Sequence, residues 1–292
     1  MKKRITLALA LSSSTAMAQE PVVLTSIKPI QMITQELMID VGQPEVLLNS
    51  NASPHDYALR PSDVKKVASA DLVIWFGHDL EPFLDKVVTK QEHVLELSKI
   101  DGLPLHEFDG DHADHDGHDH GSHDPHFWLG YQPTQQVAKA ITEQLKQLDS
   151  DHATQYEANY QRFTQRLATQ REELTERLAP VKNVGYFVFH DAYGYFEQDY
   201  GLNHLGHFTV SPDRKPGAKT LIRIRTALAD KQAKCVFAEP QFTPAVVKSV
   251  VRGSSAKVGV LDPIGSDVEV KAGSYFTFID QMANDFITCL AQ

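Results

Sequence analysis

Short runs of apolar residues, separated by longer mixed segments, form the main pattern in the first third of the chain. Four such runs lie at residues 22–27, 46–48, 72–76 and 94–97. Near-continuous apolar strands that alternate with helical stretches are typical of a parallel sheet covered on both faces. These runs therefore predict a four-stranded, mostly parallel sheet flanked by helices.

The same pattern returns in the last third of the chain. Apolar runs lie at residues 184–189, 204–208, 235–238 and 258–261. They predict a second sheet of the same kind. A chain of 292 residues is too long for one small core and suits two α/β lobes.

Two helical stretches between these patterns are predicted over residues 133–180. In the second stretch, apolar residues recur at helical spacings of three, four and seven. They are Tyr156, Tyr160, Phe163, Leu167, Leu174 and Leu178. Ser150 and Asp151 are candidate N-caps, and Pro180 is a stop signal. Such a helix spans on the order of 40 Å, so we expect a rigid connection that lets the lobes tilt only modestly.

The first 18 residues have the pattern of a secretory signal. Lys2, Lys3 and Arg4 precede an apolar run at residues 5–11, and small residues end at Ala18. The apolar run is far shorter than the roughly 20 residues that span a bilayer. No lipid-accepting Cys follows it. We therefore expect a mature protein that is free in the periplasm and has no membrane anchor.

These observations divide the chain into four parts. We expect a signal peptide at residues 1–18 and an N-terminal lobe at 19–132, which includes a loop at 106–124. Linking helices follow at residues 133–180, and a C-terminal lobe at 181–292. We expect this protein to be a monomer.

The charge balance narrows the choice of partners. The formal net charge is −10, and loss of the three basic residues with the signal would make it −13. An acidic chain disfavours nucleic acid and anionic membranes as partners. It suits a small cation.

The two cysteines, Cys235 and Cys289, both lie in the last quarter of the chain. In an exported protein, such a pair favours a disulfide bond. The alternative is a metal site with two thiolate ligands. That site needs further Cys or His residues at short spacing, which the sequence lacks around both cysteines.

A His/Asp-rich segment, residues 106–126, holds seven of the 14 histidines. Imidazole and carboxylate groups together suit zinc, copper or nickel. Its glycines and charges preclude a packed core, so we expect a mobile loop that collects metal with low affinity. The auxiliary ligand candidates within it are His112, His115, His118, His120 and His123.

A selective site needs ligands on rigid elements, and ligands of open α/β sheets bind at the carboxyl ends of strands. Four polar residues follow predicted strands, namely His78, His190, Glu239 and Asp262. Two further candidates, His55 and His126, each follow a proline in a turn. Each of these histidines alone is more often structural than a ligand.

Six motifs resemble the ZnuA family, the periplasmic zinc-binding subunits of bacterial ABC importers. They are SPHDYALRPSDV at residues 53–64, HFWL at 126–129, YFVFHDAYGYF at 186–196, GHFTV at 206–210, FAEPQF at 237–242 and LDP at 261–263. The resemblance covers essentially the whole mature chain. It implies two lobes joined by a long rigid helix, with Zn²⁺ bound in the cleft between them and delivered to a membrane permease.

By matching motifs, the resemblance places the three histidine ligands of the family on His55, His126 and His190. Three neutral imidazoles fit zinc and leave one position of a tetrahedral shell. Manganese-binding relatives carry a carboxylate in place of His190, because manganese prefers hard oxygen ligands. His190 therefore favours zinc.

The fourth ligand stays open because Pro54 stands where some relatives have Glu. The resemblance offers Asp262 or a water molecule, and we favour water with Asp262 nearby. Asp191 and Glu239 are weaker candidates, since a carboxylate at such a site can orient a histidine. His207 resembles a residue that completes an auxiliary metal site in some relatives, but a partly exposed strand histidine explains it equally well.

Three functions are compatible with these residues. The first is zinc capture without chemistry. The second is a zinc hydrolase, since three histidines and a water also hold catalytic zinc. Against it, the sequence has no His-Glu-x-x-His motif and no evident general base. The third is a nickel or copper store or chaperone built on the His/Asp-rich segment.

Overall fold

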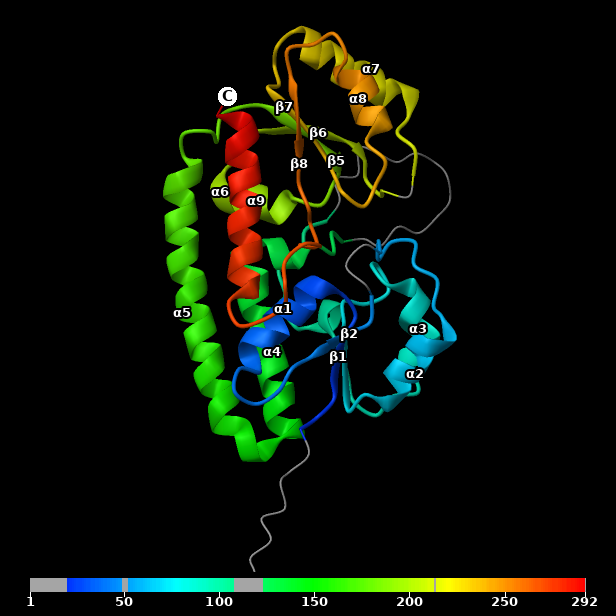
Figure 1. Cartoon of the computed structure of the whole chain (residues 1–292), viewed down its shortest axis with the longest axis vertical. Helices are drawn as coiled ribbons and strands as arrows, with labels where there is room; N and C mark the ends of the chain where they lie inside the picture. Colours follow the sequence, from blue (N-terminus) through cyan, green and yellow to red (C-terminus); the bar gives the residue numbers. More distant parts are fainter. Residues whose placement is uncertain (1–19, 49–51, 108–122, 213, 292) are drawn as a thin grey trace, which may run out of the picture.

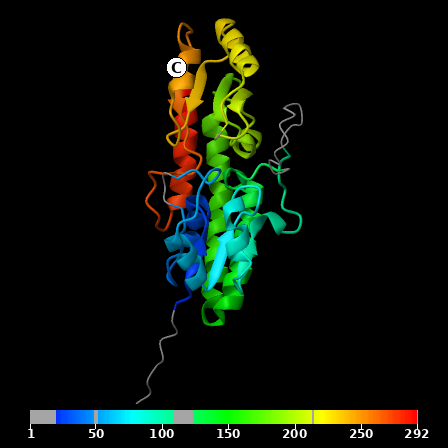
Figure 2. The same cartoon turned by 90° about the vertical axis from the view of Figure 1, so that its right-hand side faces the viewer.

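The computed structural model describes residues 20–48, 52–107, 123–212 and 214–291. The predicted signal peptide at residues 1–18 lies outside them. Within the described residues, two parallel four-stranded sheets flanked by helices confirm the predicted α/β fold (Figure 1). Figure 2 shows that the molecule is elongated, because the two sheets follow one another along its long axis.

The first sheet has the strand order β2-β1-β3-β4, and every pair in it is parallel. Its strands are β1 (Val23–Thr25), β2 (Glu45–Val46), β3 (Leu72–Trp75) and β4 (Val94–Glu96). Its helices are α1 (Lys28–Leu37), α2 (Pro61–Ser69) and α3 (Asp85–Val88), with short 3-10 turns at Pro82–Leu84 and Leu97–Lys99. Helix α1 lies on one side of the sheet, and α2 and α3 lie on the other (Figure 1).

The second sheet has the order β6-β5-β7-β8 and is also parallel throughout. Its strands are β5 (Tyr186–His190), β6 (His204–Thr209), β7 (Cys235–Ala238) and β8 (Lys257–Val260). Its helices are α6 (Gly194–Tyr200), α7 (Ala218–Ala229), α8 (Ala245–Val251) and α9 (Ser274–Leu290). All eight strands occur where the apolar runs predicted them, with ends shifted by a few residues.

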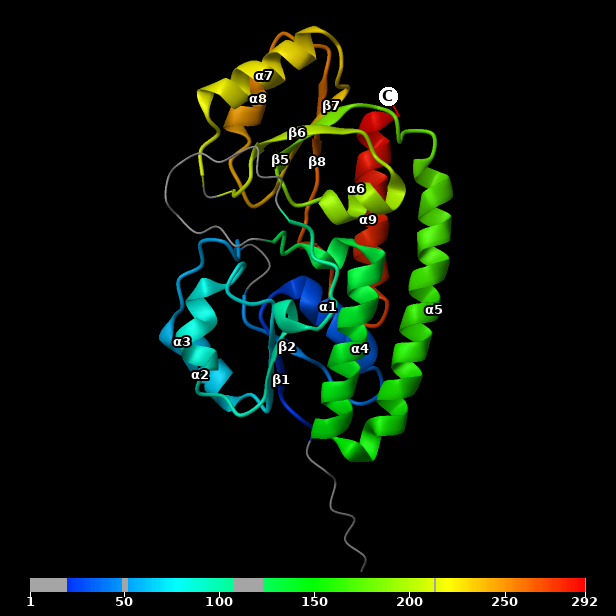
Figure 3. The ribbon, with the colours of Figure 1, turned by 180° about the vertical axis from the view of Figure 1, so that it is seen from behind.

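Two long helices connect the sheets. Helix α4 covers Tyr131–Leu148, and α5 covers Ala153–Leu178. Figure 3 shows them as an antiparallel pair in which α5 runs alongside both halves of the molecule. Helix α5 contacts α1 from the first half and α9 from the second. Its 26 residues span about 39 Å, so the predicted long connection is present.

The start of α5 differs from the prediction. Ser150 and Asp151 do not cap α5, because they form a 3-10 turn, Ser150–His152, that precedes it. The carboxylate of Asp149 holds this turn, since its Oδ2 lies 2.8 Å from His152 Nδ1 and accepts a hydrogen bond from Tyr156 Oη at 2.9 Å. The predicted stop is confirmed, because α5 ends two residues before Pro180.

Alternate residues of the central strands pack into two hydrophobic clusters. Tyr186 and Val188 of β5 belong to a large cluster that extends through α5 and α9 into the first half of the molecule. Phe187 and Phe189 belong to a smaller cluster beneath α7 and α8. Burial on both faces explains why these strands are apolar throughout. The large shared cluster also limits how far the two halves can move apart.

The predicted disulfide is present between Cys235 of β7 and Cys289 of α9. It fastens the last helix to a central strand, across a sequence separation of 54 residues. Breaking this crosslink is expected to lower the free energy of unfolding by about 4 kcal/mol, because the unfolded chain regains loop entropy. Urea unfolding of the wild type and of the Cys235→Ala, Cys289→Ala double variant measures the difference. A loss below about 1 kcal/mol would contradict this account of the crosslink.

Candidate metal centre

Three histidines that are distant in the sequence meet at one point. His55, His126 and His190 each offer a ring nitrogen, and these atoms all lie within 4.8 Å of one another. The Nε2 atoms of His126 and His190 are 3.3 Å apart. The ring of His55 lies 5.6 Å from each of the other two rings, between centroids. His126 and His190 are buried, and His55 is half-buried.

Each ligand candidate is placed by a different local structure. His190 is the last residue of β5. The sequence predicted that the strand ends at residue 189 and that His190 follows it. His126 immediately precedes a 3-10 turn of three buried residues, Phe127–Leu129. In this turn, Trp128 Nε1 donates a hydrogen bond to the Pro263 carbonyl at 2.7 Å. That bond ties the His126 turn to the second half of the chain.

His55 lies in a turn between β2 and α2, and its backbone N–H donates to Ser53 Oγ at 3.3 Å. The following segment is fixed by Asp63, whose carboxylate accepts hydrogen bonds from Tyr57 Oη and from the Arg60 backbone N–H. His55 is half-buried, so it is the most exposed of the three histidines.

Buried carboxylates orient the two buried rings. Glu239 follows β7, the parallel neighbour of β5, and its two oxygens lie 2.6 Å and 2.7 Å from His190 Nδ1. Asp124 Oδ1 lies 2.6 Å from His126 Nδ1 and also accepts from the His126 backbone N–H at 3.0 Å. A carboxylate at Nδ1 fixes the tautomer in which Nδ1–H donates and Nε2 carries a free lone pair. Both Nε2 atoms consequently present lone pairs to the same point.

Burial favours the neutral form that a metal requires. The pKa of His126 is held well below its usual range, first by burial and second by the charge of His190. Tyr193 Oη donates to Glu239 Oε1 at 3.2 Å. Burial raises the pKa of Tyr193 well above its usual range, so this hydroxyl stays a donor. The carboxylate beside His190 is therefore supported in turn.

The spacing of the nitrogens suits a tetrahedral metal ion. Imidazole nitrogens bind zinc at about 2.0–2.1 Å, which places two of them about 3.3–3.4 Å apart in a tetrahedral shell. The observed separation of 3.3 Å between His126 Nε2 and His190 Nε2 agrees with this value. The adjoining cavity measures about 20 Å³ and is also lined by Phe242 and Ile264. It has room for an ion and a water molecule.

Asp262 lies outside this group of ligand atoms. Its carboxylate accepts hydrogen bonds from Gln241 Nε2 at 2.7 Å, Ile264 N at 3.2 Å and Ser266 N at 2.5 Å. These bonds use both oxygens to hold the turn after β8. His78 also lies elsewhere: it is exposed, and its Nδ1 is 2.7 Å from Asp85. The structure therefore brings together four of the six residues proposed from strand ends and turns: three as ligand candidates, and Glu239 against His190.

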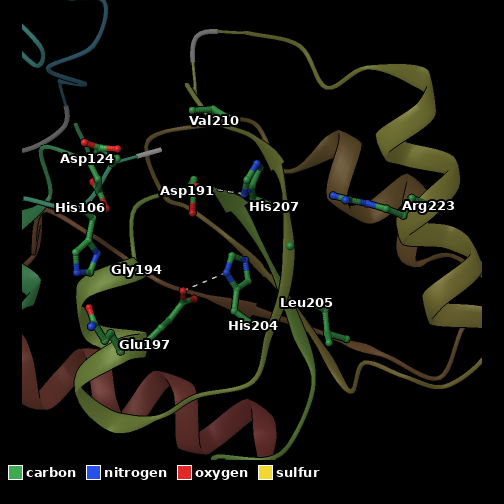
Figure 4. Close-up of a pocket in the computed structure, with 13 residues that line it drawn as sticks. His106, Asp124, Asp191, Gly194, Glu197, His204, Leu205, His207, Val210 and Arg223 are labelled. Atoms are coloured by element: carbon green, nitrogen blue, oxygen red, sulfur yellow. Dashed lines mark ion pairs between the residues drawn. The ribbon is translucent and has the colours of Figure 1, made fainter. Parts of the chain in front are cut away.

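The auxiliary candidates are only partly within the described residues. His112, His115, His118 and His120 lie outside them. His123 Nδ1 is 3.8 Å from Asp79 Oδ2. His207 lies on β6, and its Nδ1 is 3.5 Å from Asp191 Oδ2. Both residues line a pocket of about 540 Å³, together with His106, His204 and Glu197 (Figure 4). Asp191 thus pairs with His207, and the pKa of its carboxyl is lowered by that hydrogen bond against the effect of burial.

Two residues at the site were not predicted from the sequence. Asp124 was one of many acidic residues in the His/Asp-rich segment, and its position two residues before His126 was the only available signal. Tyr193 gave no signal of its own, because it stands among other aromatic residues in the motif at residues 186–196. Glu239 was considered as a group that could orient a histidine, and its contact with His190 agrees with that role.

Among the described residues, no helix combines the length and the apolar character needed to cross a membrane.

The fold and the three-histidine group together define the class: a two-lobed α/β solute-binding protein with a group that could hold a metal. Residues 23–289 match the family described as the periplasmic component A of the zinc-uptake complex, ZnuA. The chain belongs to this family.

Individual relatives agree with this assignment. The high-affinity zinc uptake system protein ZnuA of Yersinia pestis is 43% identical, over 92% of this chain and 91% of that protein. The protein of the same name from Haemophilus ducreyi is 42% identical over 100% of both chains. Among solved structures, a mutant of the laminin-binding adhesin of Streptococcus agalactiae has a TM-score of 0.79 at 25% identity, over 92% of this chain and 99% of that one.

Replacing Glu239 by Gln is expected to weaken zinc binding by about 10- to 100-fold, because the His190 ring loses its charged partner. Competition titration with a zinc chelator measures the change. Glu36→Gln is the matched control, since Glu36 is equally buried but bonds to the Gly273 backbone N–H away from the histidines. Equal affinities for Glu239→Gln and the wild type would contradict the orienting role.

Zinc affinity is expected to fall below about pH 6.5, the reference pKa of imidazole, because a protonated ring must lose its proton to bind metal. Because burial lowers the pKa of His126, this ring is neutral there and does not compete. Chelator titrations between about pH 5.5 and 7.5 test this. A flat profile would contradict a histidine site.

Proposed function

We propose that this protein captures Zn²⁺ in the periplasm, in the cleft between its two lobes, and delivers it to the membrane permease of an ABC importer. His55, His126 and His190 are the ligands, and a water molecule fills the fourth position. The observation that carries the proposal is the pair of carboxylate-oriented imidazoles with Nε2 atoms 3.3 Å apart. The zinc uptake systems of the 42–43% identical relatives support the choice of cargo.

The way the nearby oxygens are used supports water as the fourth ligand. Both oxygens of Asp262 accept backbone hydrogen bonds. Both oxygens of Glu239 lie against His190 Nδ1. With only nitrogen donors on the protein side, the site favours zinc over manganese, which prefers oxygen ligands.

Binding rather than hydrolysis is supported by the size of the cavity. A cavity of about 20 Å³ takes an ion and a water but not an ester or a peptide. The carboxylates nearest the metal position are paired with histidine Nδ1 atoms, which leaves them unsuited to act as a general base. We therefore propose that the protein carries out no reaction.

Periplasmic residence and a monomeric state are part of the same proposal. The signal-like residues 1–18 and the disulfide between Cys235 and Cys289 both suit an exported protein. The shared hydrophobic cluster and α5 hold the two lobes together, so release to the permease requires a small tilt and not a wide opening.

Two variants should distinguish zinc binding at the three histidines from zinc binding at the His/Asp-rich segment. His190→Ala is expected to lower zinc affinity by more than the roughly 100-fold typical of removing an orienting partner. Deletion of residues 109–123 is expected to leave one tight site per chain. Isothermal titration calorimetry in competition with a chelator measures both. His78→Ala, which removes an exposed histidine at a strand end, is the control.

Three results would contradict the proposal. If the deletion abolishes tight binding, the segment and not the histidine cluster is the functional centre, as in a metal store. If His190→Ala binds zinc as tightly as the wild type, the ligand set is wrong. Hydrolysis of ester or peptide substrates by the zinc-loaded protein would favour an enzyme.

A further inference from the structure

The two ends of the His/Asp-rich segment are held together at its base. The backbone N–H of Asp124 donates to the carbonyl of His106 at 2.7 Å, and Glu107 pairs with His123 as an isolated antiparallel bridge. This base lies beside the metal centre, because Asp124 contacts His126. Any group that fixes the base therefore also fixes the carboxylate that orients a ligand.

Tyr195 of α6 is such a group, and it comes from the other half of the chain. Its hydroxyl accepts a hydrogen bond from the His106 backbone N–H at 2.9 Å and donates one to the Asp124 carbonyl at 2.8 Å. Its ring stacks on that of His106, with 3.9 Å between centroids and 10° between planes. One side chain thus contacts both ends of the segment across sequence separations of 89 and 71 residues.

The hydroxyl is suited to this double role. Tyr195 is 3% exposed, so water does not readily replace either bond. Burial raises the pKa of Tyr195, with the charge of Asp124 as the second cause. The hydroxyl therefore keeps its single hydrogen, which goes to the Asp124 carbonyl, while its lone pair accepts from His106. Replacement by Phe would keep the stacked ring and remove both bonds.

A continuous set of contacts leads from Tyr195 to the metal position. Tyr195 fixes the Asp124 backbone, Asp124 Oδ1 holds His126 through both the backbone N–H and Nδ1, and His126 Nε2 faces His190 Nε2. Every bond in this set is formed by a buried side chain. A small shift at Asp124 would therefore be transmitted to the ring of His126 with little relaxation by solvent.

We propose that Tyr195 is a positioning residue for the zinc ligand His126, acting through Asp124 from the opposite lobe. The inference rests on the proposed function, because it assigns His126 as a ligand. It makes the geometry of one ligand depend on a contact between the lobes. Zinc affinity is thereby coupled to how the second lobe sits on the base of the His/Asp-rich segment.

Tyr195→Phe in the full mature chain is expected to weaken zinc binding by about three- to ten-fold, the change that loss of a hydrogen bond produces. The Co²⁺-substituted variant should show altered visible absorption bands, because a rotated imidazole changes the ligand field. Tyr156→Phe is the matched control, since it removes a hydroxyl bonded to Asp149 at the far α4–α5 turn. It should lower thermal stability without changing either readout.

A double-variant cycle tests whether Tyr195 acts through Asp124. Asp124→Asn alone is expected to weaken zinc binding by about 10- to 100-fold. In that background, Tyr195→Phe should have little further effect. Equal effects of Tyr195→Phe in the two backgrounds would overturn the proposed route.

The outcomes separate this inference from the proposed function. If the wild type binds zinc tightly and Tyr195→Phe matches it in both affinity and Co²⁺ spectrum, the positioning role is wrong while zinc capture stands. If His190→Ala leaves zinc binding unchanged in the wild-type background, the proposed function itself is wrong. A changed Co²⁺ spectrum for Tyr195→Phe with an unchanged one for Tyr156→Phe supports the positioning role.

Discussion

Each of the two buried imidazoles at the metal centre turns Nδ1 toward a buried carboxylate, and the geometry of the site depends on this pairing. Burying an imidazole and a carboxylate costs solvation, which close hydrogen bonds recover in part. The pairing fixes which ring nitrogen is free. As a result, Nε2 of His126 and Nε2 of His190 face each other at 3.3 Å, a contact between lone pairs that a cation would stabilise. The carboxylates also offset the charge that a divalent ion brings into the protein.

The fold supplies these pairs by two different means. His190 and Glu239 meet because β5 and β7 are parallel neighbours, so the last residue of β5 and the residue that follows β7 lie at one edge of the sheet. His126 and Asp124 meet because they flank a proline in one turn, which Trp128 and Tyr195 tie to the other half. Helix α5 and the shared hydrophobic cluster contact both halves of the molecule. A rigid scaffold of this kind holds ligands close to the geometry that selects a metal.

Much of the fold could be predicted from the sequence, because strands buried on both faces leave continuous apolar runs such as residues 72–76 and 235–238. The helix stop at Pro180 has an equally local cause. The convergence of His55, His126 and His190 could be proposed only through a family resemblance, since no local pattern brings residues so far apart together. Tyr195 was missed because its partners are backbone atoms 71 and 89 residues away. Backbone hydrogen bonds leave no trace in the side-chain pattern.

In the proposed site, three imidazole nitrogens and a water molecule hold the zinc ion. X-ray absorption at the zinc edge, on protein lacking residues 109–123 and loaded with one equivalent of Zn²⁺, tests it most directly. We expect four nitrogen or oxygen neighbours at about 2.0–2.1 Å, with the outer-shell scattering of three imidazoles. Scattering from fewer than two imidazoles, or a shell of five or six oxygens, would contradict it.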